Sequence, residues 1–290
     1  PIPSIILCLM GPIGIINIVL IITNIVFTYR GLKRHDFFDK YAFEVEKILL
    51  HREYKRLISS GFLHVSWMHL IFNMMSLYLF SDIVELYLGS TNFLIIYFAS
   101  LLGGNLFSLF IHRHHGDYSS VGASGTVCGI IFASIALFPG IGVGFFFLPV
   151  YIPGWLYGVG YVLYSVYSIR SKRDNIGHEA HLGGALIGLT LAVIMHPSSL
   201  LDNYFPILAI AVPAIFFIYM IITRPHFLLI DNYYFKKHHR YIDIDHKYNA
   251  DKADKQRQVD AILEKIHRHG MNSLTKKEKE MLEQYSQTMN

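Results

Sequence analysis

The chain has 290 residues, of which 53% are hydrophobic and 16% charged, and its formal net charge is +4. Soluble domains carry about 25% charged residues, so this composition argues against a soluble domain and favours a protein of the lipid bilayer. No basic patch interleaved with aromatic residues is present, and no nucleic-acid partner is expected. Cys8 and Cys128 both lie in apolar segments, which argues against a disulfide framework and a cysteine-rich zinc site.

Seven apolar runs have the composition of membrane-spanning helices. In chain order they are about Gly11–Tyr29, Val65–Phe80, Asn92–Ile111, Gly122–Leu137, Gly154–Ile169, Ala180–Met195 and Tyr204–Thr223. No positive charge precedes the first run, so we expect it to be a retained span and not a cleaved signal peptide. Residues 31–63 mix charged and aromatic residues, as segments at a membrane interface do. A connector with several prolines, residues 139–153, precedes the fifth run.

A charged tail follows the last run from Arg224 onward. Its apolar residues at 259, 262, 263 and 266 have helical spacing, and Gly270 ends that helix. Ser273 or Thr275 is the expected N-cap of a second helix. We therefore predict an all-α membrane protein with six core transmembrane helices in residues 1–200. An additional transmembrane helix is expected in residues 201–225, and a charged, mostly helical soluble tail in residues 226–290.

The fourth run begins within an uncharged stretch from Tyr118 to Ile169, and it opens on the sequence Gly122-Ala123-Ser124-Gly125. Two interpretations of Ser124 are open. Small residues are frequent in membrane helices because they allow close helix packing. Alternatively, the hydroxyl is a nucleophile, which requires a base and an oxyanion site elsewhere in the chain.

Polar residues in two other runs could supply these groups. His69 and Asn73 are four residues apart in the second run and share one helix face, and His64 is expected at the entrance of that helix. In the sixth run, His181, Gly184 and Gly188 form one stripe. Gly125 and Gly129 form a similar stripe beside Ser124. If these two glycine stripes face each other, the Ser124 hydroxyl and the His181 imidazole can come within hydrogen-bond distance.

Zinc binding is a weaker alternative. The sequence His178-Glu179-Ala180-His181 resembles a metalloprotease motif, but its two histidines are three residues apart and not four, as that motif requires. We therefore expect no metal site and no cofactor. The loop histidines 112, 114, 115, 238 and 239 are interpreted as solvated.

Together these residues resemble the rhomboid family of intramembrane serine proteases, in its bacterial form with six spans plus one. The matching residues are His64, His69 and Asn73, then Gly122, Ser124 and Gly125 (the family's GxSG), and Ala180, His181, Gly184 and Gly188 (AHxxGxxxG). Glu85 and Gly89 resemble the family's ExxxG. Two positions depart from the pattern: Lys55-Arg56 stands where Trp-Arg is frequent, and Cys128 where an aromatic residue often stacks on the catalytic imidazole.

The resemblance implies a serine endopeptidase that hydrolyses peptide bonds in or near transmembrane segments of membrane-protein substrates. Ser124 would be the nucleophile and His181 the base. Asn73, His69 and the Ser124 backbone N–H would bind the oxyanion, with His64 and the motif glycines in support. The fifth run is the candidate lateral gate for substrate. The main alternative is an inactive rhomboid-like protein that binds transmembrane helices, and a channel or transporter is a third class.

Two indications about the membrane orientation oppose each other. With seven spans, all 25 Lys and Arg fall on one side, and the positive-inside rule places that side in the cytoplasm. The resemblance implies the opposite, because the dyad of bacterial rhomboids opens toward the extracytoplasmic side. We adopt the family orientation and expect an integral multi-pass protein of a bacterial cytoplasmic (inner) membrane.

Overall fold

The computed structural model describes residues 14–113, 115–145, 148–171 and 177–223. In the tail it describes residues 259, 262, 265, 266, 274, 275 and 278. The tail histidines 238 and 239 and loop residue His114 lie outside the described residues.

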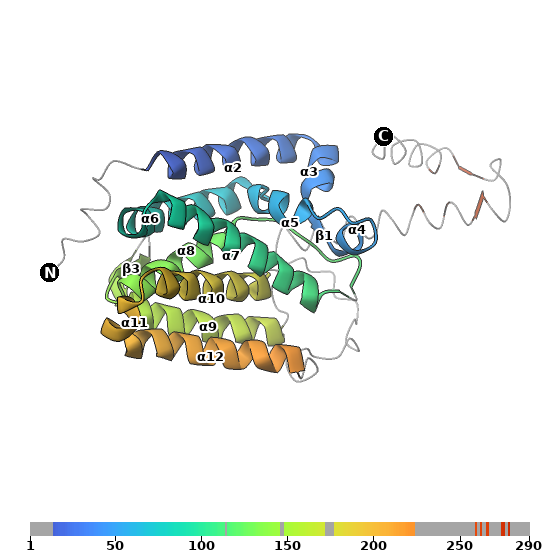
Figure 1. Ribbon diagram of the computed structural model, residues 1–290. Coiled ribbons are helices and arrows are strands. Elements are labelled where there is room, and N and C mark those ends of the chain that lie inside the picture. Colours follow the sequence, from blue (N-terminus) through green and yellow to red (C-terminus); the bar gives the residue numbers. More distant parts are fainter. Residues whose placement is uncertain are drawn as a thin grey trace.

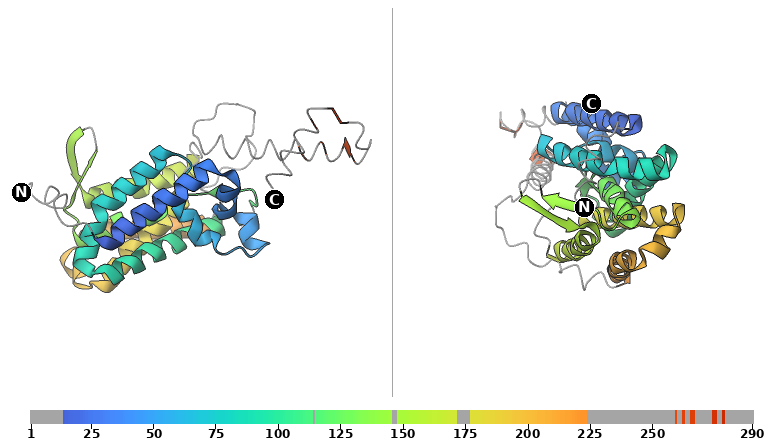
Figure 2. Two further views of the ribbon diagram at one scale, coloured as in Figure 1. Left: turned by 90° about the horizontal axis from the view of Figure 1, so that it is seen from above. Right: turned by 90° about the vertical axis from the view of Figure 1, so that its left-hand side faces the viewer.

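Seven helices run along a common direction and form the bundle in Figure 1. They are α2 (Ile15–Lys33), α6 (Trp67–Leu88), α7 (Ser90–Ile111), α8 (Ser124–Leu137), α9 (Gly154–Ser171), α10 (His178–Met195) and α12 (Tyr204–Thr223). Helix α2 lies at one edge of the bundle and α12 at the opposite edge, with α9 next to α12 (Figures 1 and 2). Each helix corresponds to one predicted apolar run, and the all-α membrane bundle is confirmed.

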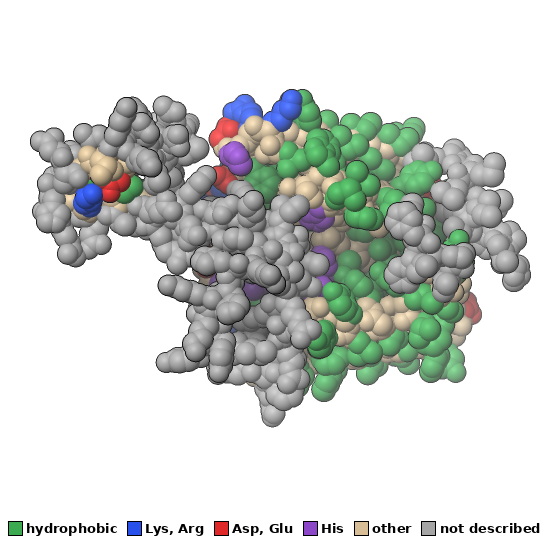
Figure 3. Space-filling view, turned by 180° about the vertical axis from the view of Figure 1, so that it is seen from behind, with side chains coloured by type: hydrophobic (Ala, Val, Ile, Leu, Met, Phe, Trp, Pro, Cys, Tyr) green, Lys and Arg blue, Asp and Glu red, His purple; other side chains and the backbone are tan. Residues whose placement is uncertain are grey.

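Most of these helices suit a bilayer. Among the described helices, α2, α6, α7, α10 and α12 are long and apolar enough to cross a membrane, judged by length and composition. Hydrophobic side chains cover most of the described surface on the face that Figure 3 shows. An apolar surface of this extent is characteristic of a face that meets lipid or a partner.

Helix α8 lies at the centre of the bundle and contacts α6, α7 and α10. Every residue from Thr126 to Leu137 is buried, as expected for a helix that is apolar on all sides. At 1.5 Å per residue its length is about 21 Å, whereas the hydrocarbon core of a bilayer is about 30 Å thick. The two ends of α8 therefore cannot both reach the surfaces of such a core.

The segment between α2 and α6 forms a cover at one end of the bundle (Figure 1). It consists of α3 (His35–Tyr41), β1 (Phe43–Glu44), α4 (Val45–Leu49), α5 (Arg56–Ser59) and the 3-10 helix η1 (Ser60–Phe62). None of these short elements could span a bilayer, in agreement with the predicted interfacial segment. Strand β1 pairs antiparallel with β2 (Ser119–Ser120), which leads into α8.

Arg56 fixes the conformation of this cover. Its side chain is buried, and its Nη1 donates hydrogen bonds to the backbone carbonyls of Asp39 (2.6 Å) and Ala42 (2.7 Å). Its Nε donates to the Glu53 carboxylate at 2.6 Å, and this contact lowers the pKa of Glu53. Arg56 therefore has a structural role in this segment. Lys55 stands before it, where the resembled motif often has Trp.

The connector between α8 and α9 contains a hairpin that the sequence analysis did not predict. Strands β3 (Gly142–Phe145) and β4 (Leu148–Pro153) pair antiparallel, with Val143 opposite Ile152. Such β-branched residues suit strands, but three prolines and the glycines concealed that signal. A short helix, α11 (Ser198–Asp202), joins α10 to α12.

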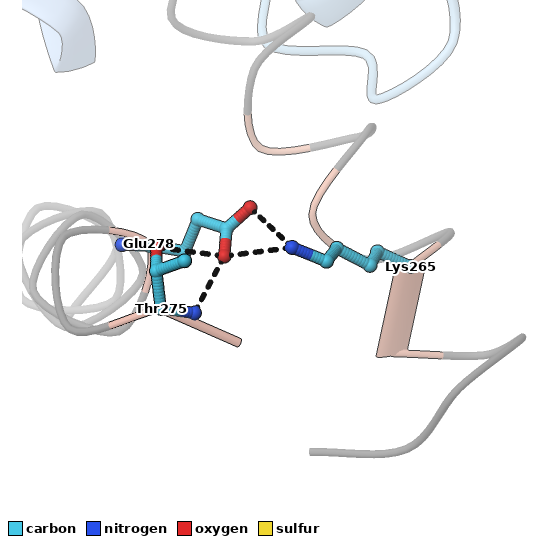
Figure 4. A network of polar contacts seen from close by, with 3 residues as sticks. All are labelled: Lys265, Thr275 and Glu278. Atoms are coloured by element: carbon cyan, nitrogen blue, oxygen red, sulfur yellow. Dashed lines mark hydrogen bonds and ion pairs between the residues drawn. The ribbon is translucent and has the colours of Figure 1, made fainter. Parts of the chain in front are cut away.

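In the tail, Thr275 forms the helix cap that Figure 4 shows. The Thr275 backbone N–H donates to the Glu278 carboxylate at 2.6 Å, and the Glu278 N–H donates to the Thr275 hydroxyl at 3.4 Å. This reciprocal pair is a capping box, so Thr275 is the cap and not Ser273. Lys265 Nζ also donates to the Glu278 carboxylate at 2.9 Å and so links the two predicted tail helices.

We expect the contact between these tail helices to weaken in acid. The hydrogen bonds from Lys265 and Thr275 lower the pKa of Glu278 from 4.5 to about 2. A carboxyl whose pKa is lower in the folded state stabilises that state above pH 4.5, and the effect is lost as the pH falls toward 2. Carboxyl-carbon NMR titration of Glu278 in the full chain should give a midpoint near 2, and Thr275→Ala should raise it. A midpoint of 4.5 in the parent would disprove the contact.

Candidate active site

Ser124 is the first residue of α8, directly after a tight turn that leads from β2 into the helix. Gly122, in this turn, has φ +138°, a backbone conformation that L-residues rarely adopt. A Cβ at Gly122 would lie 2.8 Å from Cε1 of His69. The Gly122 N–H donates to the Ser60 carbonyl at 3.0 Å. The GxSG glycine is therefore required both by the turn and by the close approach of His69.

His181 lies in the first turn of α10, opposite Ser124. The His181 Nε2 atom and the Ser124 Oγ atom are 2.5 Å apart. The two glycine stripes face each other and allow this approach. A Cβ at Gly184 would lie 2.1 Å from the Gly125 carbonyl oxygen, and a Cβ at Gly188 would lie 2.0 Å from that of Gly129. Helices α8 and α10 can therefore pack at this distance only because hydrogens replace side chains where they cross.

The second ring nitrogen of His181 has a partner that the sequence analysis missed. The Tyr161 hydroxyl, on α9, lies 3.0 Å from His181 Nδ1. The same hydroxyl lies 3.1 Å from Cys128 Sγ. Tyr161 belongs to the aromatic run in α9 that is the candidate gate, and no motif marks it. The one signal in the sequence was Cys128, because an aromatic residue that would stack on the His181 imidazole is missing at that position.

His69 lies on the other side of the turn, and Asn73 follows it on α6. The point where a Gly122 Cβ would lie is 3.1 Å from His69 Nε2 and 3.5 Å from Ser124 Oγ, so both side chains approach the same glycine. Asn73 is buried one helical turn further along α6, and its Nδ2 donates one hydrogen bond to the His69 carbonyl at 2.9 Å. The N-terminus of α8 adds the positive end of its helix dipole. Donors and dipole suit an anionic group beside Ser124.

His64 precedes α6, as predicted, and it is fully buried. Burial, together with the nearby His69, lowers the pKa of His64 to about 3, so its imidazole is neutral at pH 7. Its Nε2 accepts the Ala123 N–H at 3.4 Å. Its Nδ1 therefore carries the hydrogen and donates to the Thr28 hydroxyl at 2.9 Å. His64 thus connects α2 to the backbone residue that precedes Ser124.

A second polar cluster surrounds the Glu179 carboxylate, two residues before His181. Glu179 accepts hydrogen bonds from Tyr118 (2.8 Å) and Ser108 (3.2 Å), and lies 3.1 Å from His112 Nε2. The His112 ring stacks on Tyr118 at 3.6 Å. Burial and the Glu179 charge raise the pKa of Tyr118, which remains a neutral donor. The interpretation of His112 as a solvated residue is therefore wrong.

No three His, Cys, Asp or Glu side chains of the described chain could together hold a metal ion. Ser124 and His181 instead line a cavity of about 40 Å³. Polar side chains of its wall include Ser60, Asn105 and Ser120. A water molecule needs roughly 10–15 Å³ of such volume, so the cavity has room for about two to four waters next to the dyad.

Comparisons with known proteins bear on the fold and the family. A family model described as the Rhomboid domain matches residues 51–198, just over half of the chain. A second model, described as a family of unknown function (DUF6576), matches residues 242–288 of the tail.

Individual relatives agree with the first match. Rhomboid protein 1 of Saccharomyces cerevisiae mitochondria is 31% identical over 136 residues, which is 46% of this chain and 39% of the yeast protein. RHOMBOID-like protein 12 of Arabidopsis thaliana mitochondria is 32% identical over 147 residues, or 45% and 43% of the two chains. YdcA of Bacillus subtilis, which carries a provisional rhomboid-protease name, is 40% identical over 78 residues, or 27% and 38%.

These matches support the family but not the bacterial type or the bacterial membrane. The chain spans about two fifths of the length of these curated relatives. Two of the three are named as mitochondrial, so the expected bacterial type and bacterial inner membrane gain no support. The membrane bundle and the match over residues 51–198 nevertheless agree with each other. The chain belongs to the rhomboid family.

Proposed function

We propose that this chain is an intramembrane serine endopeptidase that hydrolyses peptide bonds of transmembrane substrates with a Ser124–His181 dyad. The observation that carries the proposal is the 2.5 Å separation of Ser124 Oγ and His181 Nε2. This pair lies at the N-terminus of a central helix that is too short to cross the bilayer. A nucleophile and base within hydrogen-bond distance, at the end of a helix buried inside a membrane bundle, suit the cleavage of bonds inside or next to a membrane span.

The proton transfers follow from the hydrogen bonds around His181. As Ser124 Oγ forms a bond to the scissile carbonyl carbon, its proton passes to His181 Nε2. The imidazolium then gives this proton to the leaving amine as the C–N bond breaks, and an acyl ester remains on Ser124. A water from the adjoining cavity attacks the ester, and its proton passes through Nε2 to Ser124 Oγ. The carboxylic acid product leaves and the dyad is restored.

The developing oxyanion needs donors that are already in place. The Ser124 backbone N–H points out of the first turn of α8, where helical N–H groups have no helical partner. His69 and the second N–H of Asn73 are on the adjacent face of α6. We assign these three donors, which come from two helices, to the oxyanion, since donors held in place by helices need little ordering when the charge forms.

Loss of one oxyanion donor should reduce turnover strongly. We expect Asn73→Ala and His69→Ala each to lower kcat by about 10²–10³-fold, with a small change in KM because the ground-state carbonyl needs these donors less. Initial rates on a transmembrane reporter in proteoliposomes measure this. Asn92→Ala, which removes an amide that donates to the Leu88 carbonyl of the preceding helix end, is the matched control. Equal rates for Asn73→Ala and Asn92→Ala would remove Asn73 from the proposed site.

Substrates must expose a carbonyl that their own helix normally hides. Lipid offers no hydrogen bonds in exchange, so favoured substrates are transmembrane segments with helix-weakening residues. Helix α9 stays the candidate for the lateral gate. A crosslink between α6 and α9 that leaves cleavage unchanged would reject this gate.

The direct test of the proposed function is cleavage of such a reporter by the purified full chain in liposomes. Cleavage that depends on Ser124 supports the endopeptidase. Specific binding of the reporter without cleavage would instead favour the inactive, helix-binding alternative. The orientation stays a prediction, which protease protection of a C-terminal tag decides.

A further inference from the structure

We propose that Tyr161 and Cys128 form a positioning pair that keeps His181 in the tautomer required for a general base. The inference rests on the proposed function and goes beyond it, because it assigns a group that holds the second ring nitrogen of His181. The Tyr161 hydroxyl lies within hydrogen-bond distance of Nδ1 of His181, at 3.0 Å.

The required hydrogen positions follow from the chemistry of each group. To take the Ser124 proton, His181 Nε2 must carry a lone pair, so Nδ1 carries the hydrogen. Nδ1–H then donates to the Tyr161 oxygen. The single hydrogen of the Tyr161 hydroxyl must therefore point elsewhere, and Cys128 Sγ lies 3.1 Å away as its acceptor. The chain of donors runs from Ser124 to His181 to Tyr161 to Cys128.

Cys128 matters because a phenol can also donate. If the Tyr161 hydroxyl turned its hydrogen toward Nδ1, the imidazole would carry its own hydrogen on Nε2 and could not accept the Ser124 proton. An acceptor on the far side of the hydroxyl opposes this arrangement. A sulfur atom is a weak acceptor, but it is held 3.1 Å from the hydroxyl by α8, the helix that also carries Ser124.

The surroundings hold the Tyr161 ring in place. The ring packs edge-on against Phe132 of α8 at 5.7 Å and stacks on Tyr157 of α9 at 5.9 Å. Three helices thus meet at this contact: α8 supplies Cys128, α9 supplies Tyr161 and α10 supplies His181. The missing aromatic residue at position 128 is replaced by one from a different helix, which supports the imidazole by a hydrogen bond.

The first test replaces the hydroxyl alone. We expect Tyr161→Phe to lower kcat by about 10-fold, the scale of one lost hydrogen bond, with KM unchanged. Tyr157→Phe is the matched control, since its hydroxyl makes no hydrogen bond described for this part of the chain and its ring is retained. Equal kcat values for the two variants would overturn the proposal.

The pH profile separates positioning from packing. Within the described part of the chain, titratable side chains near His181 include Cys128 of α8, Tyr161 of α9 and His178 of α10, whose ring centroid is 5.9 Å from that of His181. An acceptor on Nδ1 stabilises the imidazolium more than the neutral ring, so its removal makes protonation harder. The acid limb of kcat/KM should therefore move to lower pH by about 0.5–1 unit in Tyr161→Phe. A purely structural loss would leave this limb in place.

Cys128 variants give an independent test that leaves the tyrosine intact. Cys128→Ala should lower kcat by about 3- to 10-fold, because the phenol is then free to donate to Nδ1. Cys128→Ser restores an acceptor and should recover activity to within about 2-fold of the parent. The double variant Tyr161→Phe/Cys128→Ala should be no slower than Tyr161→Phe alone, since without the Tyr161 hydroxyl no hydrogen can be donated to His181 Nδ1. A serine variant as slow as the alanine variant, or additive losses in the double variant, would overturn the pairing.

Failure of this inference is distinct from failure of the proposed function. The parent chain and Ser124→Ala are measured first on the same reporter. If the parent does not cleave, the proposed function fails. If the parent cleaves in a Ser124-dependent way and Tyr161→Phe behaves as Tyr157→Phe, the positioning pair alone is rejected.

Discussion

Replacing Ser124 with alanine is expected to lower the rate of hydrolysis by about 10⁴-fold or more. The hydroxyl forms the covalent bond in the first step, and no other group within the described site can take its place at 2.5 Å from His181 Nε2. Removal of a nucleophile or base from a serine protease has an effect of this scale. His181→Ala should be similarly slow, and the double variant no slower than either, because the two residues act as a unit.

The control for this prediction is another buried hydroxyl of the same helix. Ser134 lies on α8, and its hydroxyl is hydrogen-bonded to the carbonyls of Phe80 (3.1 Å) and Ile130 (2.9 Å). Ser134→Ala also removes one hydroxyl from α8, but this hydroxyl is not part of the site, so the rate of hydrolysis should stay within a few-fold of that of the parent. Rates are measured on a transmembrane reporter in proteoliposomes. Residual cleavage by Ser124→Ala at a tenth of the parent rate would contradict the dyad.

The second large effect is expected from Gly184→Ala, which should destabilise the fold. The added Cβ would lie 2.1 Å from the Gly125 carbonyl oxygen and 3.3 Å from that of Ser100. Both are backbone atoms that cannot rotate away, so α10 must shift from α8. Overpacking of this kind costs about 1–3 kcal/mol. A shift of about 1 Å between reacting groups lowers turnover by about 10²-fold, so activity should fall with stability.

Gly160→Ala provides the comparison for Gly184→Ala. Gly160 is also helical, on α9, and a Cβ there would meet no described atom within 4 Å. Because alanine favours a helix over glycine by about 1 kcal/mol, this variant should be as stable as the parent or more so. The measurement is the midpoint of unfolding as SDS replaces a mild detergent. If both variants unfold at the parent midpoint, α8 and α10 are not packed as described.

The bundle could be predicted from the sequence because lipid imposes a simple rule. Each span must form its own backbone hydrogen bonds and present apolar side chains to the lipid. The prediction was less accurate where the packing of helices overrides this rule. The second span was expected to end at Phe80, before Asp82 and Glu85, but α6 continues to Leu88. Asn17 of α2 donates to the Ser81 hydroxyl beside this turn. Polar groups of one helix thus form hydrogen bonds with polar residues of the neighbouring helix. The sequence of a single apolar run does not reveal such a contact.

The approach of Ser124 to His181 was predictable for a different reason. Small residues at helical spacing identify helix faces that can approach closely, and one such stripe begins beside Ser124 while another contains His181. Tyr161 was not predictable, because α9 offers Tyr157, Tyr161, Tyr164 and Tyr167 with similar surroundings in the sequence. Which of them meets His181 depends on the rotation of α9 against α10. The two-residue pairing of β1 with β2 is similar, since it joins segments about 75 residues apart and leaves no local pattern.

The most direct measurement is labelling of Ser124 by a serine-reactive fluorophosphonate in membranes that contain the full chain. The reagent reports an activated hydroxyl without any assumption about the substrate or the orientation. The dyad predicts that the parent is labelled and that labelling is lost in both Ser124→Ala and His181→Ala. A parent that is never labelled, or labelling that persists in Ser124→Ala, would contradict it.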